Sequence, residues 1–168
     1  EGTETLQATI SYPCYPSVDP RDPPRAPANL LDDEPQATAN LSVTTNGNEA
    51  GPVNIVYTVT LSAVNNTGAA ITFDLAASGG SATSGADYTA IPLGAQISVA
   101  NGSATGTYTV TVLDDLLLEG TETLQATISN PSNPAVVAIG TASATANLLD
   151  DEPQATANLS GTTNGNEA

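Results

Sequence analysis

The sequence predicts an all-β protein, an immunoglobulin-like, seven-stranded antiparallel β-sandwich in tandem repeats of 118 residues. Apolar residues alternate with Thr, Ser and Asn at a period of two along seven short segments. Clusters of Asn, Gly, Ser and Pro separate these segments, and no segment has the period of a helix. Seven strands in about 118 residues are typical of a two-sheet sandwich.

The expected strands follow one another within a single repeat. In chain order they are Ala37–Thr45, Asn54–Ser62, Ala70–Ser78, Ala95–Val99, Gly106–Leu113, Thr121–Ile128 and Gly140–Leu149. In the second strand Ile55, Tyr57, Val59 and Leu61 share one face, as in a strand with one buried side. In the fifth strand Val110 and its apolar neighbours face inward, while threonines face outward. Leucine, alanine and isoleucine alternate in the same way in the sixth strand.

The repeat is visible as identical strings at one constant offset. Residues 1–11 recur as 119–129, residues 29–42 recur as 147–160, and residues 44–50 recur as 162–168, each displaced by 118 positions. A period of this length indicates a whole domain per repeat rather than a coil of a solenoid. The sequence therefore predicts three parts, namely the end of one repeat (1–34), a complete repeat (35–152) and the first strand of the next (153–168).

One segment, Tyr12–Ala28, departs from its counterpart in the next repeat. It aligns without gaps to Asn130–Ala146 but differs at 12 of 17 positions, and it holds both arginines, the one cysteine and four extra prolines. Proline removes a strand hydrogen bond. Two interpretations stay open, a degraded copy of an ordinary strand and a true proline-rich variant. The incomplete repeats at the ends also leave open an exchange of strands between chains.

The charge balance excludes several classes of partner. The chain has 18 acidic residues, two arginines and no lysine or histidine, for a net charge of −16. Nucleic acid and anionic membranes attract basic residues, so neither is an expected partner. No apolar run approaches the roughly 20 residues of a membrane span. Without a signal peptide or an initiating Met, the chain is expected to be part of something longer.

The acidic residues are concentrated in particular connections. In a seven-stranded antiparallel sandwich, the first, third and fifth connections between strands and the tail after the last strand share one end of the domain. Eight acids of the complete repeat occupy these segments: Glu49, Asp87, Asp114, Asp115, Glu119, Asp150, Asp151 and Glu152. The other connections carry none. Acids so close together raise each other's pKa and repel one another unless a cation lies between them.

Calcium is the ion that this composition favours. Ca²⁺ takes about 6–8 oxygen ligands in flexible geometry. Zinc, iron and copper sites prefer His or Cys, which residues 35–152 lack, and Mg²⁺ keeps more of its water. The alternative is a solvated acidic surface, but such a surface would also carry acids on its strand faces, where this chain has Thr, Ser and Asn.

Three motifs resemble the Calx-β domain. They are VLDDLLLEGTETLQATISNPS (112–132), ATANLLDDE (144–152) and SGADYTA (84–90). The resemblance implies an immunoglobulin-like sandwich that holds calcium at one end. It matches Glu49, Asp87, Asp114, Asp115, Glu119, Asp150, Asp151 and Glu152 to ligand positions, and it adds Glu1, Asp32, Asp33 and Glu34 from the preceding repeat. Leu116 stands where exchanger domains can have a third Asp, which implies weaker or fewer sites.

These observations predict a non-enzymatic structural repeat of an extracellular protein. Calcium would fix the segment between repeats and so stiffen the protein, which would be a surface stalk, an adhesin shaft or a filament. The partners would be neighbouring repeats of the same protein, as in a homopolymer. A second possibility is a ligand-binding adhesion module, which would need an aromatic-lined pocket. An enzyme is disfavoured because residues 35–152 offer no His, Lys or Cys as base or nucleophile.

Overall fold

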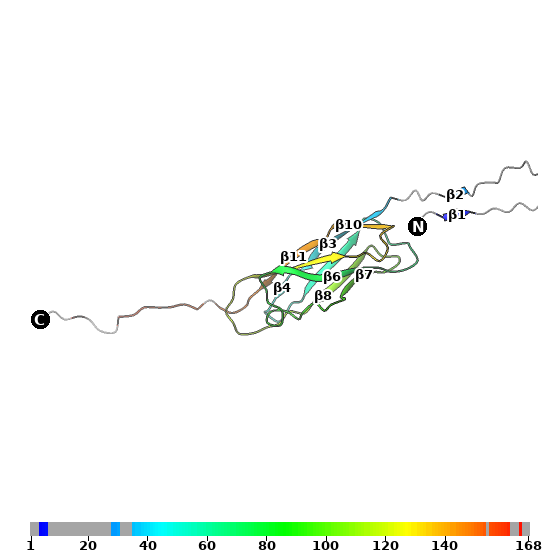
Figure 1. Ribbon diagram of the computed structural model, residues 1–168. Helices are drawn as coiled ribbons and strands as arrows, with labels where there is room; N and C mark the ends of the chain where they lie inside the picture. The colour runs from blue at the N-terminus through cyan, green and yellow to red at the C-terminus, as the bar shows by residue number, and fades with distance from the viewer. Residues whose placement is uncertain (1–3, 7–27, 31–34, 154, 162–164, 166–168) are drawn as a thin grey trace, which may run out of the picture.

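Alternating apolar residues place nine strands of residues 37–149 in two sheets packed face to face (Figure 1). The computed structural model describes residues 4–6, 28–30, 35–153, 155–161 and 165. The strands are β3 (Ala37–Thr45), β4 (Gly47–Asn48), β5 (Ile55–Leu61), β6 (Ile71–Gly80), β7 (Gln96–Val99), β8 (Thr105–Val110), β9 (Glu122–Ser129), β10 (Val137–Thr141) and β11 (Ser143–Leu149). One sheet has the order β10-β3-β5-β8 and the other β4-β11-β9-β6-β7.

The inner faces of both sheets form one apolar core. In β5 the side chains of Ile55, Tyr57 and Val59 are fully buried, and in β9 those of Leu124, Ala126 and Ile128 are buried. The Tyr57 hydroxyl donates a hydrogen bond of 2.6 Å to the carbonyl oxygen of Leu124. This bond joins the two sheets, because β5 and β9 belong to different ones. The predicted all-β sandwich is thereby confirmed.

The strand count differs from the prediction first at the last expected strand, Gly140–Leu149, which spans the end of β10 and all of β11 in different sheets. The first three residues of β10, Val137–Ile139, were not expected to form a strand. Residues Val137–Thr141 pair in parallel with β3, whereas Ser143–Leu149 pair antiparallel with β9. The chain crosses between the sheets at Ala142. Gly140 allows the close approach of β10 to β3, since a Cβ there would lie 2.5 Å from Cγ2 of Thr38. The short β4 is the second addition, so the sandwich has nine strands rather than seven.

A separate two-stranded sheet lies in the first part of the chain. Strand β1 (Glu4–Leu6) pairs antiparallel with β2 (Ala28–Leu30), and Glu4 is opposite Leu30. The register is the same as that of Glu122 opposite Leu148 in the sandwich, 118 residues later. The predicted division into 1–34, 35–152 and 153–168 stays a prediction. The variant segment, up to Pro27, lies outside the described residues.

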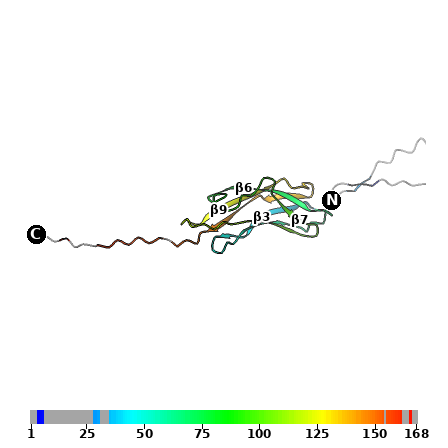
Figure 2. The same cartoon turned by 90° about the horizontal axis from the view of Figure 1, so that it is seen from below.

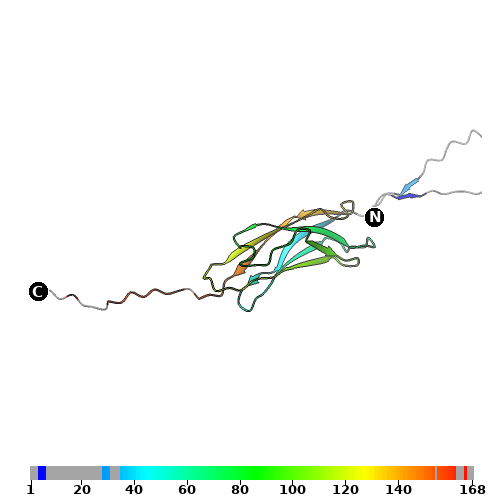
Figure 3. The same cartoon turned by 60° about the horizontal axis from the view of Figure 1, so that its bottom comes forward.

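The strands run along the length of the sandwich, so the connections gather at its two ends (Figures 2 and 3). The chain enters β3 at one end, which we call the entry pole. It leaves β11 at the other end, where the connections β4–β5, β6–β7 and β8–β9 also lie (Figure 1). We call this end the acid pole. No helix in the described part of the chain is long and apolar enough to cross a membrane.

Candidate metal centre

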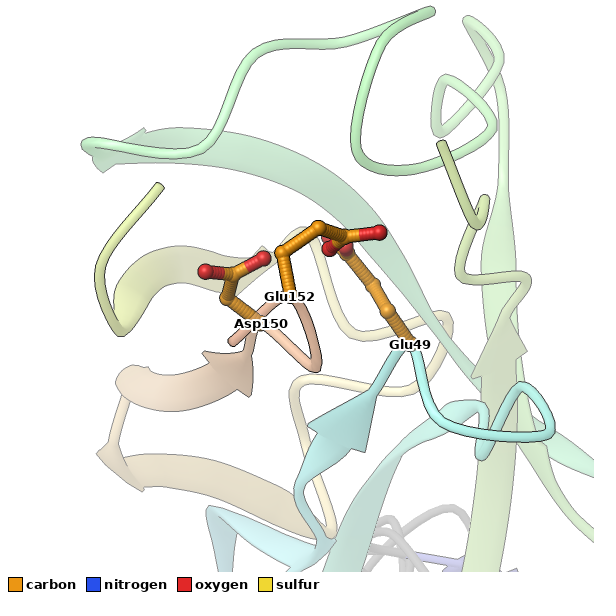
Figure 4. A group of neighbouring side chains, drawn as sticks. All are labelled: Glu49, Asp150 and Glu152. Carbon is orange, nitrogen blue, oxygen red and sulfur yellow. The ribbon is translucent and has the colours of Figure 1, made fainter. Parts of the chain in front are cut away.

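Acidic side chains from four separate segments meet at the acid pole. In three groups, one carboxylate oxygen of each residue lies within 4.8 Å of those of the others: Glu49 with Asp150 and Glu152, Asp87 with Glu119 and Glu122, and Asp114 with Asp151 and Glu152. Glu152 belongs to two of the groups and therefore links them. In Figure 4 the carboxyl groups of Glu49 and Glu152 lie beside each other, although the two residues come from distant segments of the chain.

Glu49 is held in place by the short strand β4. Its backbone N–H donates a 2.9 Å hydrogen bond to the carbonyl oxygen of Leu149, the last residue of β11. The preceding Asn48 exchanges backbone hydrogen bonds with Val53, so the chain turns back immediately after Glu49. The side chain is only 3% exposed. The pairing of β4 with β11 thus places Glu49 beside the acids that follow β11.

Asp87 is fixed by a tight turn in the β6–β7 connection. Its carboxylate accepts a hydrogen bond from the backbone N–H of Thr83, and its own N–H donates one of 3.0 Å to the Thr83 carbonyl. The Asp87 carbonyl accepts a 2.9 Å bond from the N–H of Leu113, at the start of the β8–β9 connection. Asp87 is also 3% exposed. A solvated acidic surface does not describe this residue or Glu49, since both are buried.

The β8–β9 connection is tied to the chain exit. The backbone N–H of Glu119 donates a 3.0 Å hydrogen bond to the Asp150 carboxylate. The Asp115 carboxylate accepts a 2.7 Å bond from the N–H of Leu117 and so closes a turn within the connection. Three residues after Glu119, Glu122 begins β9, where it pairs with Leu148. The strand therefore carries its carboxyl group directly into the second group.

The carboxyl groups raise one another's pKa. Burial, followed by the charges of Asp150 and three other acids, raises the pKa of Glu49 from 4.5 to about 7. A shared hydrogen bond with Asp87, together with burial, raises the pKa of Glu122 to about 7. The pKa values of Glu119 and Glu152 are raised as well, chiefly by burial for Glu119 and by a hydrogen bond with Asp150 for Glu152. With all of these groups charged, the pole is unfavourable unless a cation is bound.

Several oxygens at this pole have no hydrogen-bond donor. Oε2 of Glu122, Oδ1 of Asp150 and Oε2 of Glu152 are buried and have no hydrogen-bond partner among the described residues. Buried polar atoms are nearly always satisfied, so unpaired carboxylate oxygens within these groups fit a cation. Residues 35–152 contain no Lys, Arg or His that could supply the charge. A hard divalent ion with oxygen ligands matches this donor set, and calcium accepts the high ligand number available here.

The structure brings together seven of the eight acids predicted for the complete repeat. Asp115 belongs to none of the three groups, although its charge raises the pKa of both Glu49 and Glu119. Sequence reasoning missed Glu122, which was assigned to the strand rather than to the acid cluster. Its spacing of three from Glu119, at the first residue of a strand, was the available signal. The predicted ligands Glu1, Asp32, Asp33 and Glu34 lie outside the described residues.

Comparison with known proteins identifies the fold and the family. The family model of the Calx-beta domain matches residues 32–152, most of the chain. The chain belongs to the Calx-β family. The resemblance seen in the three sequence motifs is thereby confirmed. Calx-β domains form a family of calcium-binding modules.

Solved Calx structures share the fold of this Calx-β chain. The crystal structure of the apo form of the Calx CBD1 domain aligns with a TM-score of 0.53 and 19% identity, covering 70% of this chain and 100% of that one. The crystal structure of calcium binding domain CBD12 of CALX1.1 aligns with a TM-score of 0.51 and 19% identity, covering 67% of this chain and 45% of that one. At this identity the likeness shows the fold alone. The search of curated proteins finds no match.

Proposed function

We propose that this Calx-β domain is a structural repeat of an extracellular tandem array, such as a surface stalk, an adhesin shaft or a filament, and that calcium stiffens its junctions. The observation that carries the proposal is the position of the acid groups. Asp150, Asp151 and Glu152 form the chain exit, and all three belong to the carboxylate groups. An ion bound there would hold the segment that leads to the next repeat.

The segment after the acid pole is short. Pro153 restricts the backbone, and the copy of the first strand begins at Ala155. A junction with its first three residues fixed by metal and its fourth fixed by a proline ring has little freedom left. Extracellular calcium modules have dissociation constants of about 10⁻⁴–10⁻³ M, which suits ions at the concentration found outside cells.

We propose a structural rather than a catalytic role on two grounds. The acids are arranged as shared ligand groups at one pole, and they surround the chain exit instead of a substrate pocket. The complete repeat also lacks His, Lys, Arg and Cys. The proposed partners are neighbouring repeats of the same protein, and near-identical repeats suit a spacer whose units must join in the same way.

Calorimetric titration of the 168-residue chain with calcium tests the site. We expect saturable binding that is lost or strongly weakened in the Asp114→Asn/Asp115→Asn variant. Asp74→Asn is the matched control, because Asp74 bonds to Gln96 and Asn130, away from the acid pole. It removes one carboxylate and should leave calcium binding unchanged. Equal loss in both variants would show that only net charge matters.

Stiffness is tested on an array. The 168-residue chain continued by a second copy of residues 51–168 contains two complete repeats, because residue 168 ends a copy of residues 44–50. Small-angle scattering of this two-repeat chain should show a narrower distribution of interatomic distances, with a larger maximum distance, in calcium than in chelator. Identical distributions in both conditions would refute calcium stiffening of the junction.

A further inference from the structure

Three consecutive leucines are exposed at the acid pole. Leu116, Leu117 and Leu118, in the β8–β9 connection, are 90%, 59% and 50% exposed. Large apolar side chains that are exposed side by side are unusual in a soluble domain and mark an interaction surface. The three residues, here called the leucine triplet, are not used by the carboxylate groups on either side of them.

The leucine triplet has a fixed place beside the chain exit. On its N-terminal side Asp114 forms a group with Asp151 and Glu152. On its C-terminal side the N–H of Glu119 bonds to Asp150. The connection is therefore hydrogen-bonded to the chain exit on one side of the triplet and lies close to it on the other. The apolar side chains lie next to the point where that repeat begins.

The opposite end of the sandwich carries a groove of about 410 Å³, which is lined by apolar residues and by the polar residues Gln36, Asn65, Asn66 and Thr67. Its floor is formed by the buried residues Leu61, Ile71 and Val137, and Val64, which is 48% exposed, lies on its rim. Pro35 and Gln36, where the chain enters the sandwich, line the same groove. The groove thus adjoins the incoming linker as closely as the leucine triplet adjoins the outgoing one.

The wall of the groove is built by a buried amide. The Asn65 side chain donates 2.9 Å hydrogen bonds to the carbonyl oxygens of Ala69 and Val99, and its oxygen accepts bonds from Thr67. Asn65 is 3% exposed. These bonds fix the β5–β6 connection, so the groove is preformed. None of the described residues that line the groove is acidic, so these residues do not repel the acid pole of another repeat.

The length of the linker decides which occupant can reach the groove. Glu34-Pro35-Gln36-Ala37 recurs as Glu152-Pro153-Gln154-Ala155, so the next repeat begins three residues after Glu152. Three residues span at most about 11 Å. The entry pole of the next repeat, with its groove, must therefore lie next to the acid pole of this one.

We propose that the leucine triplet of each repeat docks in the entry-pole groove of the repeat that follows it. The joint is heterologous, because two different surfaces of the same unit meet, and such contacts propagate along a chain. The inference rests on the proposed array, because the groove is occupied by the leucine triplet of a second copy of this unit. It goes beyond calcium stiffening, because the apolar contact needs no ion in the groove.

Disulfide trapping in the two-repeat chain tests the docking. All variants carry Cys14→Ser, which removes the native cysteine. In the test variant Leu117→Cys in the first repeat is combined with Val64→Cys in the second. We expect a disulfide to form at least about tenfold faster than in the matched pair of Leu117→Cys with Thr107→Cys, since Thr107 is exposed on a strand face. Equal rates for the two pairs would overturn the proposal. Disulfides between separate chains instead of within one would overturn the assignment of the occupant.

A second variant separates docking from calcium. Leu116→Ser/Leu117→Ser/Leu118→Ser should leave the melting temperature of the 168-residue chain unchanged, because the triplet is exposed there. In the two-repeat chain the same substitutions should broaden the distribution of interatomic distances measured by small-angle scattering. Unchanged dimensions in this variant would overturn the docking. Selective trapping that persists in chelator would uphold the docking even if calcium proved to have no effect on stiffness.

Discussion

The calcium-free domain should become less stable as the pH rises from 5 to 8. In the folded chain the pKa of Glu49 is about 7, against 4.5 for the ordinary value. Between these values the folded state holds a proton that the unfolded state has lost. Stability therefore falls with rising pH, as the linkage relation requires.

The expected loss is about 3 kcal/mol for Glu49 alone, because each pKa unit corresponds to about 1.4 kcal/mol. Glu122, whose pKa is also raised to about 7, titrates in the same window and acts in the same direction. Asp74 acts in the opposite direction, but its pKa is lowered from 3.8, so its titration is complete below pH 5. The net change between pH 5 and 8 is therefore a loss.

Urea unfolding of the 168-residue chain in chelator, at pH 5, 6, 7 and 8, measures this dependence. The Glu49→Gln variant, which is neutral at every pH, should show a flatter profile with most of its remaining slope due to Glu122. Calcium-free wild-type protein that is as stable at pH 8 as at pH 5 would refute the reasoning, since it would mean that the acids are solvated and independent.

Three further outcomes follow from the same structure. At pH 8, 10 mM calcium should stabilise the chain by about 1.4–2.7 kcal/mol per site, for dissociation constants of 10⁻³–10⁻⁴ M, measured by urea unfolding. Glu122→Gln should weaken calcium binding in calorimetry although the sequence motif did not identify it, because its carboxylate completes the group with Asp87 and Glu119. An unchanged affinity would exclude it as a ligand. Tyr57→Phe should lower the free energy of unfolding by about 1–2 kcal/mol at any calcium concentration, because the buried Leu124 carbonyl loses the hydrogen bond from the Tyr57 hydroxyl. A loss of stability that depends on calcium would contradict a purely structural role.

Most strands could be predicted because their alternation is local. Ala37–Thr45 was predicted with its observed bounds, and the second to sixth strands agree within a few residues. The last strand could not be divided from the sequence, because the change of sheet at Ala142 leaves the alternation of apolar residues almost intact. Only the partner strands distinguish the two parts of the predicted strand, β3 for Gly140 and Thr141 and β9 for Ser143–Leu149, and pairing is not a local property.

The acid pole could be predicted from topology, because strand direction alone decides which connections share an end. The grouping within the pole could not. Whether Asp115 joins a group depends on a turn in which its carboxylate accepts a hydrogen bond from Leu117. Whether Glu122 joins one depends on the face of β9 at its first residue. The face of Glu122 follows from the alternation that buries Leu124 and Ala126, whereas the direction of the Asp115 side chain is set by a local turn that the order of the residues does not specify.

In the proposed array, the carboxylate groups and the leucine triplet act on the same junction. The β8–β9 connection carries Asp114 and Glu119 on either side of the triplet. Asp114 lies close to the chain exit, and Glu119 is hydrogen-bonded to it. An ion that draws these carboxylates together would also fix the backbone between them, and with it the direction of the leucines. A leucine triplet docked in the next repeat would conversely hold the carboxylates in place for the ion. Since coupling of this kind is reciprocal, the ionic and apolar contacts reinforce each other at every junction.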